Sequence, residues 1–264
     1  MNKAVSRSVI AIAALFLSAT AANAQSGDWT WHGTVSSGGR VKVSGVVGDI
    51  VATPSSGREV EVVARMSRHG RAADDVKIIA VEGDNGVTIC ALYTNSDRDR
   101  TDERTCTSNN HNGSNNNNDP TTVDFEVRVP RGVEFEGNTV VGDVDARGMT
   151  AFAAGASVTG DVEIETTELA RASSVSGSVH VTMGRADWNG TMSFSSVSGS
   201  VTLVLPGNLN ADVRASTVSG DIDSDWPMTV RGRIASRSVN ATIGSGGRTL
   251  NISTVSGEIA LRRR

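Results

Sequence analysis

The sequence Ser-Val-Ser-Gly-Ser-Val occupies residues Ser174–Val179 and recurs unchanged at Ser196–Val201. Variants of this phrase continue from residue 139 to the C-terminus, with 16 to 22 residues between equivalent positions. Self-similarity at such a short period is typical of a solenoid, in which each repeat forms one coil that stacks on its neighbours. The repeat therefore predicts an all-β chain, a β-solenoid or β-helix of stacked rungs.

Three positions of the repeat are nearly constant. A Val lies two residues before the glycine, a Val or Ile two residues after it, and a Ser or Thr three residues before it. Because strand side chains alternate between faces, we predict that both apolar positions and the glycine face the core. The repeat positions are Val140, Gly142, Val158, Gly160, Val175, Gly177, Val197, Gly199, Val218, Gly220, Val255 and Gly257, with a weaker copy at Val239, Ala241 and Ile243.

The glycine should leave room where another part of the coil approaches or the chain bends. Upstream of each copy the apolar residues have the opposite parity, as Met192 and Phe194 illustrate. We therefore place a corner between the Ser/Thr and the Val, and expect the Ser/Thr column to form hydrogen bonds along the stack. The last copy runs into Arg262, Arg263 and Arg264, a charge cluster suited to discouraging edge-to-edge stacking at that end.

The first 24 residues have the features of a signal peptide. Lys3 and Arg7 precede an apolar run at residues 9–19, and Ala22-Asn23-Ala24 fits a small-x-small cleavage site. We expect cleavage before Gln25, which leaves 23 basic and 29 acidic residues and a net charge of −6. This balance argues against a nucleic-acid partner, and no later stretch could span a membrane as a helix, so we expect no integral membrane segment after cleavage.

The rest of the chain divides into three parts. Residues 25–56 should form the first strands and a first rung at Val46-Val47-Gly48-Asp49-Ile50, and residues 133–264 the repeat solenoid. Between them, residues 57–132 are predicted to be inserted β-strands, with a hairpin across the turn at 82–86 and a strand at 123–129. The polar, Asn-rich stretch 94–122 should be a disordered loop. Cys90 and Cys106 fit one structural disulfide of an exported protein.

Carboxylates on the outward positions beside two glycines are the candidates for chemistry. Asp143, Asp145, Asp161 and Glu163 could bind Ca²⁺ or act as the acid pair of a polysaccharide-cleaving enzyme. Later rungs carry Ser178 and His180, then Ser200 and Thr202, at the same positions, so the row is not sustained. A solvated face is therefore the favoured interpretation. We assign no catalytic residue, metal ligand or cofactor.

The motifs Val-x-Gly-Asp-Ile near the start, Val-Asp-Phe-Glu-Val-Arg-Val-Pro-Arg-Gly at Val123–Gly132 and the repeated Val-Ser-Gly together resemble the bacterial DUF4097 "putative adhesin" family. The resemblance implies a β-helical domain of cell-envelope proteins with no assigned catalytic residues.

Three functions follow as hypotheses. The leading one is a non-catalytic protein, exported to the periplasm, cell surface or medium, that binds an envelope protein or a surface glycan as an adhesin or scaffold. A polysaccharide-acting enzyme that uses the acidic face and an envelope sensor are the alternatives.

Overall fold

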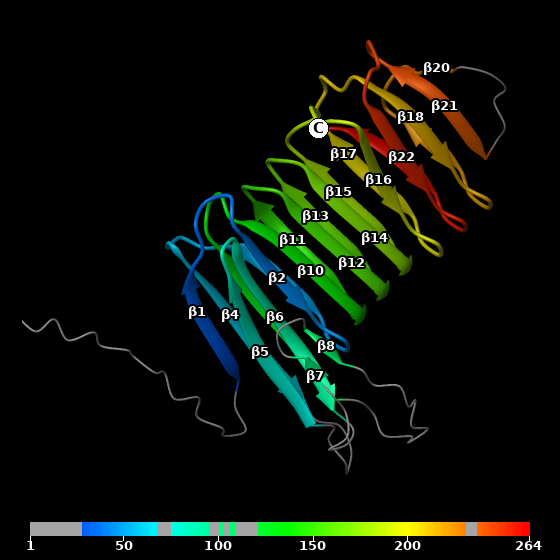
Figure 1. The fold of residues 1–264 in the computed structure, drawn as a ribbon. Coiled ribbons are helices and arrows are strands. Elements are labelled where there is room, and N and C mark those ends of the chain that lie inside the picture. The colour runs from blue at the N-terminus through cyan, green and yellow to red at the C-terminus, as the bar shows by residue number, and fades with distance from the viewer. Residues whose placement is uncertain (1–27, 68–74, 95–100, 103–105, 109–120, 231–236) are drawn as a thin grey trace, which may run out of the picture.

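The structure, a computed structural model, describes residues 28–67, 75–94, 101–102, 106–108, 121–230 and 237–264. Every regular element in these residues is a β-strand (Figure 1). The described residues contain no helix long and apolar enough to cross a membrane. The predicted signal peptide and most of the Asn-rich stretch 94–122 lie outside the described residues, and so do Lys3, Arg7 and the cleavage site.

The strands form two large sheets and one small one. Sheet A has ten strands in the spatial order β1 (Trp29–Thr34), β4 (Glu59–Ser67), β9 (Thr122–Val129), β3 (Ile50–Pro54), β11 (Val144–Met149), β13 (Val162–Thr166), β15 (Val179–Met183), β17 (Val201–Leu205), β23 (Ile259–Arg263) and β19 (Ile222–Ser224). Sheet B has eleven strands in the order β20 (Thr229–Val230), β21 (Ser238–Ile243), β18 (Ala211–Ser216), β22 (Thr249–Ser253), β16 (Thr191–Ser195), β14 (Ala170–Ser176), β12 (Ala153–Thr159), β10 (Glu134–Val141), β2 (Arg40–Ser44), β6 (Gly86–Thr94) and β5 (Asp75–Gly83). The strands β7 (Thr101–Asp102) and β8 (Thr107–Ser108) pair only with each other.

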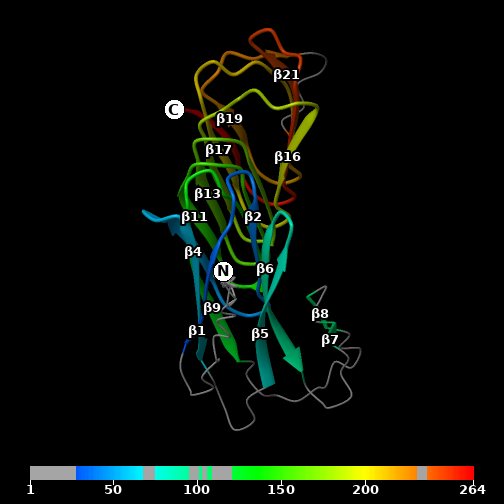
Figure 2. The same ribbon diagram turned by 60° about the vertical axis from the view of Figure 1, so that its left-hand side comes forward.

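A rung consists of one strand of sheet B, a corner, and the following strand of sheet A. The corner contains the repeated glycine, and on the opposite side a return segment leads back to sheet B for the next rung. Equivalent strands of consecutive rungs pair in parallel, for example Val162 with Val179 and Val179 with Val201. Figure 2 shows the two sheets as separate layers that face each other. The predicted β-solenoid is confirmed, and so is the early rung at Gly48, which joins β2 to β3.

The rungs do not stack in sequence order. The last rung of the chain, β22–β23, lies between β16–β17 and β18–β19, because β22 pairs with both β16 and β18, and β23 with both β17 and β19 (Figure 1). The rung β18–β19 therefore precedes β22–β23 in the sequence but lies beyond it in the stack.

Two sequence predictions about this end are corrected. The copy at Val239, Ala241 and Ile243 is not a rung, because β21 runs antiparallel to β18 and pairs Val239 with Ala215. The arginine-rich C-terminus does not terminate the stack either. Arg262 forms ion pairs with Asp223 and Asp225 of the neighbouring rung.

The predicted insert at residues 57–132 belongs to the same two sheets. β6 pairs in parallel with β2, and β9 with β3, so they extend the stack by one further rung. Three strands then cover this end in the antiparallel sense: β5 on β6, β4 on β9, and β1 on β4. The β5–β6 pair is the predicted hairpin, and Gly83 pairs with Gly86 across its turn.

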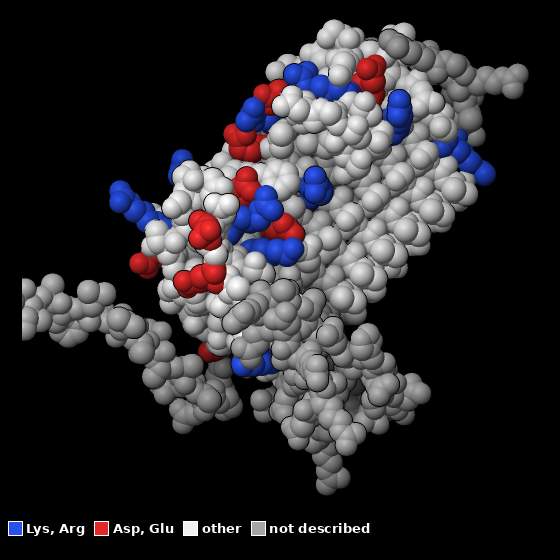
Figure 3. Space-filling model, in the orientation of Figure 1, with Lys and Arg blue, Asp and Glu red and all other residues white. Residues whose placement is uncertain are grey.

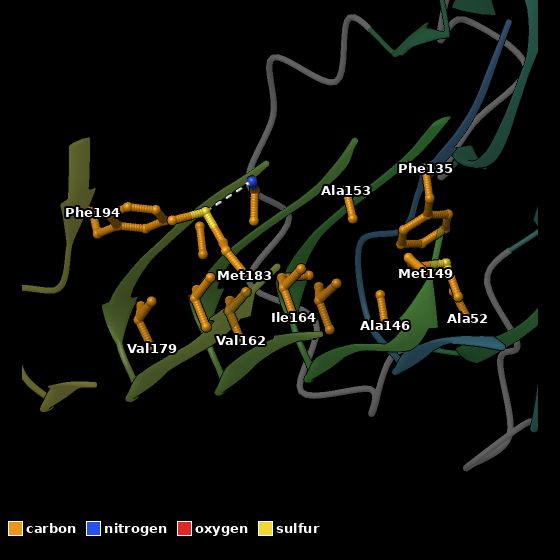
Figure 4. Packing of buried hydrophobic residues seen from close by; sticks show 14 of the residues in the cluster. Ala52, Phe135, Ala146, Met149, Ala153, Val162, Ile164, Val179, Met183 and Phe194 are labelled. Carbon is orange, nitrogen blue, oxygen red and sulfur yellow. Dashed lines mark hydrogen bonds between the residues drawn. The ribbon is translucent and has the colours of Figure 1, made fainter. Parts of the chain in front are cut away.

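The core between the sheets contains mainly small and β-branched residues (Figure 4). Ala146, Ile164, Val162 and Val179 form columns along sheet A. In sheet B the larger Phe135 and Phe194 each have an alanine as one register neighbour, Ala153 and Ala172 respectively. Such residues suit a pleated, closely stacked interior. Five of the core positions two residues after the glycine are buried as predicted, with exposed fractions of 0–1% at Val144, Val162, Val179, Val201 and Ile259. Ile222, on the edge strand β19, is only partly buried.

Candidate functional site

The backbone at each corner is set by close contact between glycines of adjacent rungs. Gly160 has a φ of +148°, and a Cβ on this residue would lie 2.0 Å from the carbonyl oxygen of Gly142. The same near-overlap recurs along the column, since a Cβ on Gly142 would lie 2.1 Å from the carbonyl oxygen of Gly48. Only glycine fits here, which confirms the predicted reason for its presence.

The Ser/Thr three residues before the glycine points inward and donates a hydrogen bond to an adjacent rung. The Ser174 hydroxyl donates to the carbonyl of Gly160 at 2.8 Å, and the Ser196 hydroxyl to that of Gly177 at 2.7 Å. The other members form the same bond and are equally buried, with exposed fractions of 4–6%: Thr139, Ser157, Thr217 and Thr254. The prediction of hydrogen bonds along this column is confirmed.

The Val two residues before the glycine faces solvent, so its predicted inward position is wrong. Val197 is 44% exposed and Val218 58% exposed. The inward parity of the sheet B strand continues through the buried Ser/Thr, and the turn that changes it comes afterwards, in Val-Ser-Gly. We call these side chains the valine ridge; its members are Val46, Val140, Val158, Val175, Val197, Val218 and Val255, all 37–58% exposed.

The valine ridge is a continuous column. The carbonyl of Val175 accepts the N–H groups of Val197 and Ser198, at 3.2 and 2.8 Å, and the carbonyl of Val197 those of Val255 and Ser256, at 3.1 and 2.9 Å. At about 4.8 Å per rung, seven valines extend over roughly 30 Å. The next position along the chain is also exposed and is Val141, Thr159, Ser176, Ser198, Ser219 or Ser256. Figure 3 shows no charge along this edge, where the strands of sheet B end, from β10 to β16.

The aspartates after the glycines hold the corners together. The N–H of Asp143 donates to Oδ1 of Asp49 at 2.8 Å, that of Asp161 to Oδ1 of Asp143 at 2.7 Å, and that of Ser178 to Oδ1 of Asp161 at 2.7 Å. Each carboxylate therefore satisfies a backbone donor of the following rung. Two of the four acidic candidates thus have a structural partner.

The other two candidates, Asp145 and Glu163, lie on either side of Arg147. Its guanidinium is 2.9 Å from Asp145 and 2.6 Å from Glu163. Partial burial raises the pKa of Asp145 above its ordinary value; Arg147 opposes this, while the negative charge of Glu163 adds to it. The structure brings all four carboxylates onto neighbouring rungs. However, among the described residues no three His, Cys, Asp or Glu side chains are grouped so that they could hold a metal ion.

Cys90 and Cys106 form a disulfide, with a Cα–Cα distance of 6.0 Å. Cys90 is buried on β6, and the bridge attaches the β7–β8 pair to this strand. The bonded pair is the one predicted from the sequence.

Sequence reasoning missed two surface features. Counting alternate residues back across the corner places these valines in the core, so the sequence pattern does not reveal the valine ridge. The second feature is a hollow formed by N-terminal parts of the chain, where Trp31 of β1 borders the β5–β6 turn. The alternation of Trp29 and Trp31 with polar residues was its only sequence signal.

Comparisons with known proteins identify the family of this chain. A "putative cell adhesion protein" from Clostridium sporogenes is 12% identical, with a TM-score of 0.48, over 90% of this chain and 100% of that one. A "putative adhesin" from Bacteroides fragilis is 13% identical, with a TM-score of 0.36, over 90% of this chain and 98% of that one. No curated protein matches the sequence. Residues 55–262 match the family described as Toastrack DUF4097. Because this match spans most of the chain, the protein belongs to the Toastrack DUF4097 family.

Proposed function

We propose that this protein is an exported, non-catalytic binding module of the cell envelope, adhesin-like in its action, and that the valine ridge is its contact surface. One observation carries the proposal. Valine recurs at the same position of each corner that contributes to the ridge, although its side chain is exposed there. Packing requires the glycine and the buried Ser/Thr, but it places no comparable demand on a side chain that is 44% exposed, as at Val197.

The chemistry of the ridge favours an extended apolar contact. Complete burial of a Val side chain is worth about 1.5 kcal/mol or more, so covering the exposed part of seven valines contributes on the order of 5 kcal/mol. Loss of translational and rotational freedom on association costs a similar amount. Each copy should therefore bind weakly, and several copies on one surface should bind much more strongly through avidity.

The non-catalytic part of the proposal is supported by the state of the acidic candidates. Asp143 and Asp161 accept backbone hydrogen bonds, and Asp145 and Glu163 share Arg147. An acid pair that cleaves a glycosidic bond needs one carboxyl group kept protonated beside a second that is ionised. Arg147 forms an ion pair with each of Asp145 and Glu163, so the same guanidinium already engages both carboxylates.

The test is retention of the mature chain, residues 25–264, on envelope fragments. The double variant V175D/V197D places two charges on the ridge, and T191D/S193D adds the same charge at exposed positions of β16. We expect V175D/V197D to lose most retention and T191D/S193D to keep it. Equal retention of the two variants would reject the ridge as the contact surface. Mass spectrometry of the protein made in bacteria should show an N-terminus at Gln25 if it is exported as proposed.

A further inference from the structure

A hollow of about 410 Å³ lies where the chain enters the solenoid, away from the valine ridge. Its walls are two turns from different parts of the sequence: residues 33–39, which connect β1 to β2, and residues 82–87, which contain the β5–β6 turn. Trp31 borders it from β1. The volume is in the range of sites that bind small molecules.

Backbone contacts fix the two turns against each other. The N–H of Arg40 donates to the carbonyl of Asn85 at 2.8 Å, which joins the two walls. Gly86 has a φ of +143°, and a Cβ on it would lie 1.9 Å from the carbonyl oxygen of Arg40. The two turns therefore approach so closely at Gly86 that a residue with a Cβ would not fit there. The hollow is formed before a ligand arrives, which reduces the entropic cost of binding.

The side chains around the hollow combine an aromatic ring with many hydrogen-bonding groups. The indole Nε1–H of Trp31 donates to Oε1 of Glu82 at 3.2 Å, so the ring and the carboxylate hold each other in place. The indole also lies against Gly33, since a Cβ there would lie 2.3 Å from its Cζ2 atom. The other exposed polar residues of the lining are Thr34, Ser36, Ser37, Asp84 and Asn85.

The hollow continues into a second one of about 650 Å³ on the outer face of sheet B, which shares the β5–β6 turn. Four of its charged residues form ion pairs: Arg40 lies 2.8 Å from Glu134, and Lys42 lies 3.0 Å from Glu136. Glu82, which also lines it, accepts the hydrogen bond from Trp31. Figure 3 shows charged side chains gathered at this end of sheet B. The two hollows together form a groove with an aromatic end and a polar, internally neutralised extension.

We propose that this groove binds a short oligosaccharide, with one sugar ring against Trp31. The C–H face of a sugar suits an indole, which is apolar in its body, and its hydroxyls suit carboxylate and backbone acceptors at Glu82 and the turns. An anionic ligand fits poorly, because Glu82 and Asp84 line the first hollow while the only basic groups of the second, Arg40 and Lys42, are already paired. A cationic peptide would be the alternative occupant.

The experiment is an NMR titration of the mature chain, residues 25–264, that follows the indole N–H signals of its four tryptophans. The probes are tetrasaccharides of N-acetylglucosamine, of β-1,4-linked glucose and of α-1,4-linked glucose, with pentalysine as the competing class. Trp31→Phe identifies the Trp31 signal. We expect at least one tetrasaccharide to move that signal saturably, while the signals of the buried Trp188 and Trp226 stay in place.

Variants then locate the site. Trp31→Ala should weaken binding about tenfold, the size of a lost aromatic contact, and Glu82→Gln, which keeps the shape of the side chain, should weaken it severalfold. Gly33→Ala, which displaces the indole and adds only a methyl group, should also weaken it. The ridge variant V175D/V197D should bind the tetrasaccharide with unchanged affinity, so failure of this proposal is distinguishable from failure of the proposed function. No movement of the Trp31 signal with any tetrasaccharide, movement with pentalysine alone, or full affinity in Trp31→Ala would overturn the assignment.

Discussion

A chain that ends at Gly247 lacks β22 and β23, the rung that lies between β16–β17 and β18–β19. In a solenoid whose rungs stack in sequence order, removal of the last rung would expose one new end and leave the remainder intact. Here it removes an interior layer. The strands β16 and β18 lose their shared neighbour, and so do β17 and β19.

The magnitude follows from the burial of the missing residues. Leu250, Ile252, Ile259 and Leu261 are at most 1% exposed. At 1.5–3 kcal/mol for each buried side chain, their loss removes about 6–12 kcal/mol of apolar stabilisation. The whole stability of a typical protein is about 5–15 kcal/mol. We therefore expect the truncated chain not to fold as one cooperative unit.

Thermal unfolding followed by circular dichroism measures the effect. The control is a chain that begins at Val35 and lacks β1, an edge strand that pairs only with β4 among the described strands. It should still unfold cooperatively, with a lowered midpoint. The reasoning is refuted if the chain that ends at Gly247 unfolds in a single transition within about 5 °C of the full-length protein.

Three smaller perturbations test the corners and one surface ion pair. Gly160→Ala should cost about 3 kcal/mol in urea unfolding, because its Cβ meets a carbonyl oxygen and its φ is +148°; a change under about 1 kcal/mol would contradict the close approach. Ser174→Ala removes a buried donor and should cost about 1–2 kcal/mol, whereas Ser176→Ala, at an exposed position, should change stability by less than about 0.5 kcal/mol; similar effects would disprove the inward position. The hydrogen bond from Arg262 lowers the pKa of Asp223, so this pair stabilises the fold above the ordinary aspartate pKa and loses that effect as the pH falls through the lowered pKa. In Arg262→Gln the pKa of Asp223, followed by carbon NMR, should rise towards its ordinary value, and an unchanged pKa would exclude the ion pair in solution.

The sequence predicts the repeat architecture well, because the close stacking of rungs requires particular residue types at the constant positions. Gly160 fits a position where a Cβ would overlap a carbonyl, and Ser174 supplies a hydroxyl that donates to the adjacent rung. The side on which the valine lies depends on the direction of the count. Alternation along the sheet B strand, from the buried Ser/Thr, places the valine outward, whereas counting back from the core Val across the glycine places it inward. The second count is wrong because the backbone leaves the strand conformation at the corner, where Gly160 has a φ of +148°.

The sequence pattern also does not predict the order in which the rungs stack. Each rung offers nearly the same Val, Ser and Gly to its neighbours, so β22–β23 can pair with β16–β17 as well as β18–β19 could. The copy at Ala241 has the spacing of a rung, yet it forms an antiparallel strand that covers β18. The hollow beside Trp31 depends on two turns about 50 residues apart, which no local pattern connects.

The most direct test of the central claim, that the corner directs its valine outward, compares Val197→Asp with Val201→Asp in thermal unfolding. The two valines belong to the same rung, but Val197 is 44% exposed and Val201 is 0% exposed. Val197→Asp should shift the unfolding midpoint by only a few degrees, whereas Val201→Asp places an unpaired charge in the core and should abolish folding. Unfolding of the Val197→Asp protein to the same extent as the Val201→Asp protein would contradict the outward valine and, with it, the proposed contact surface.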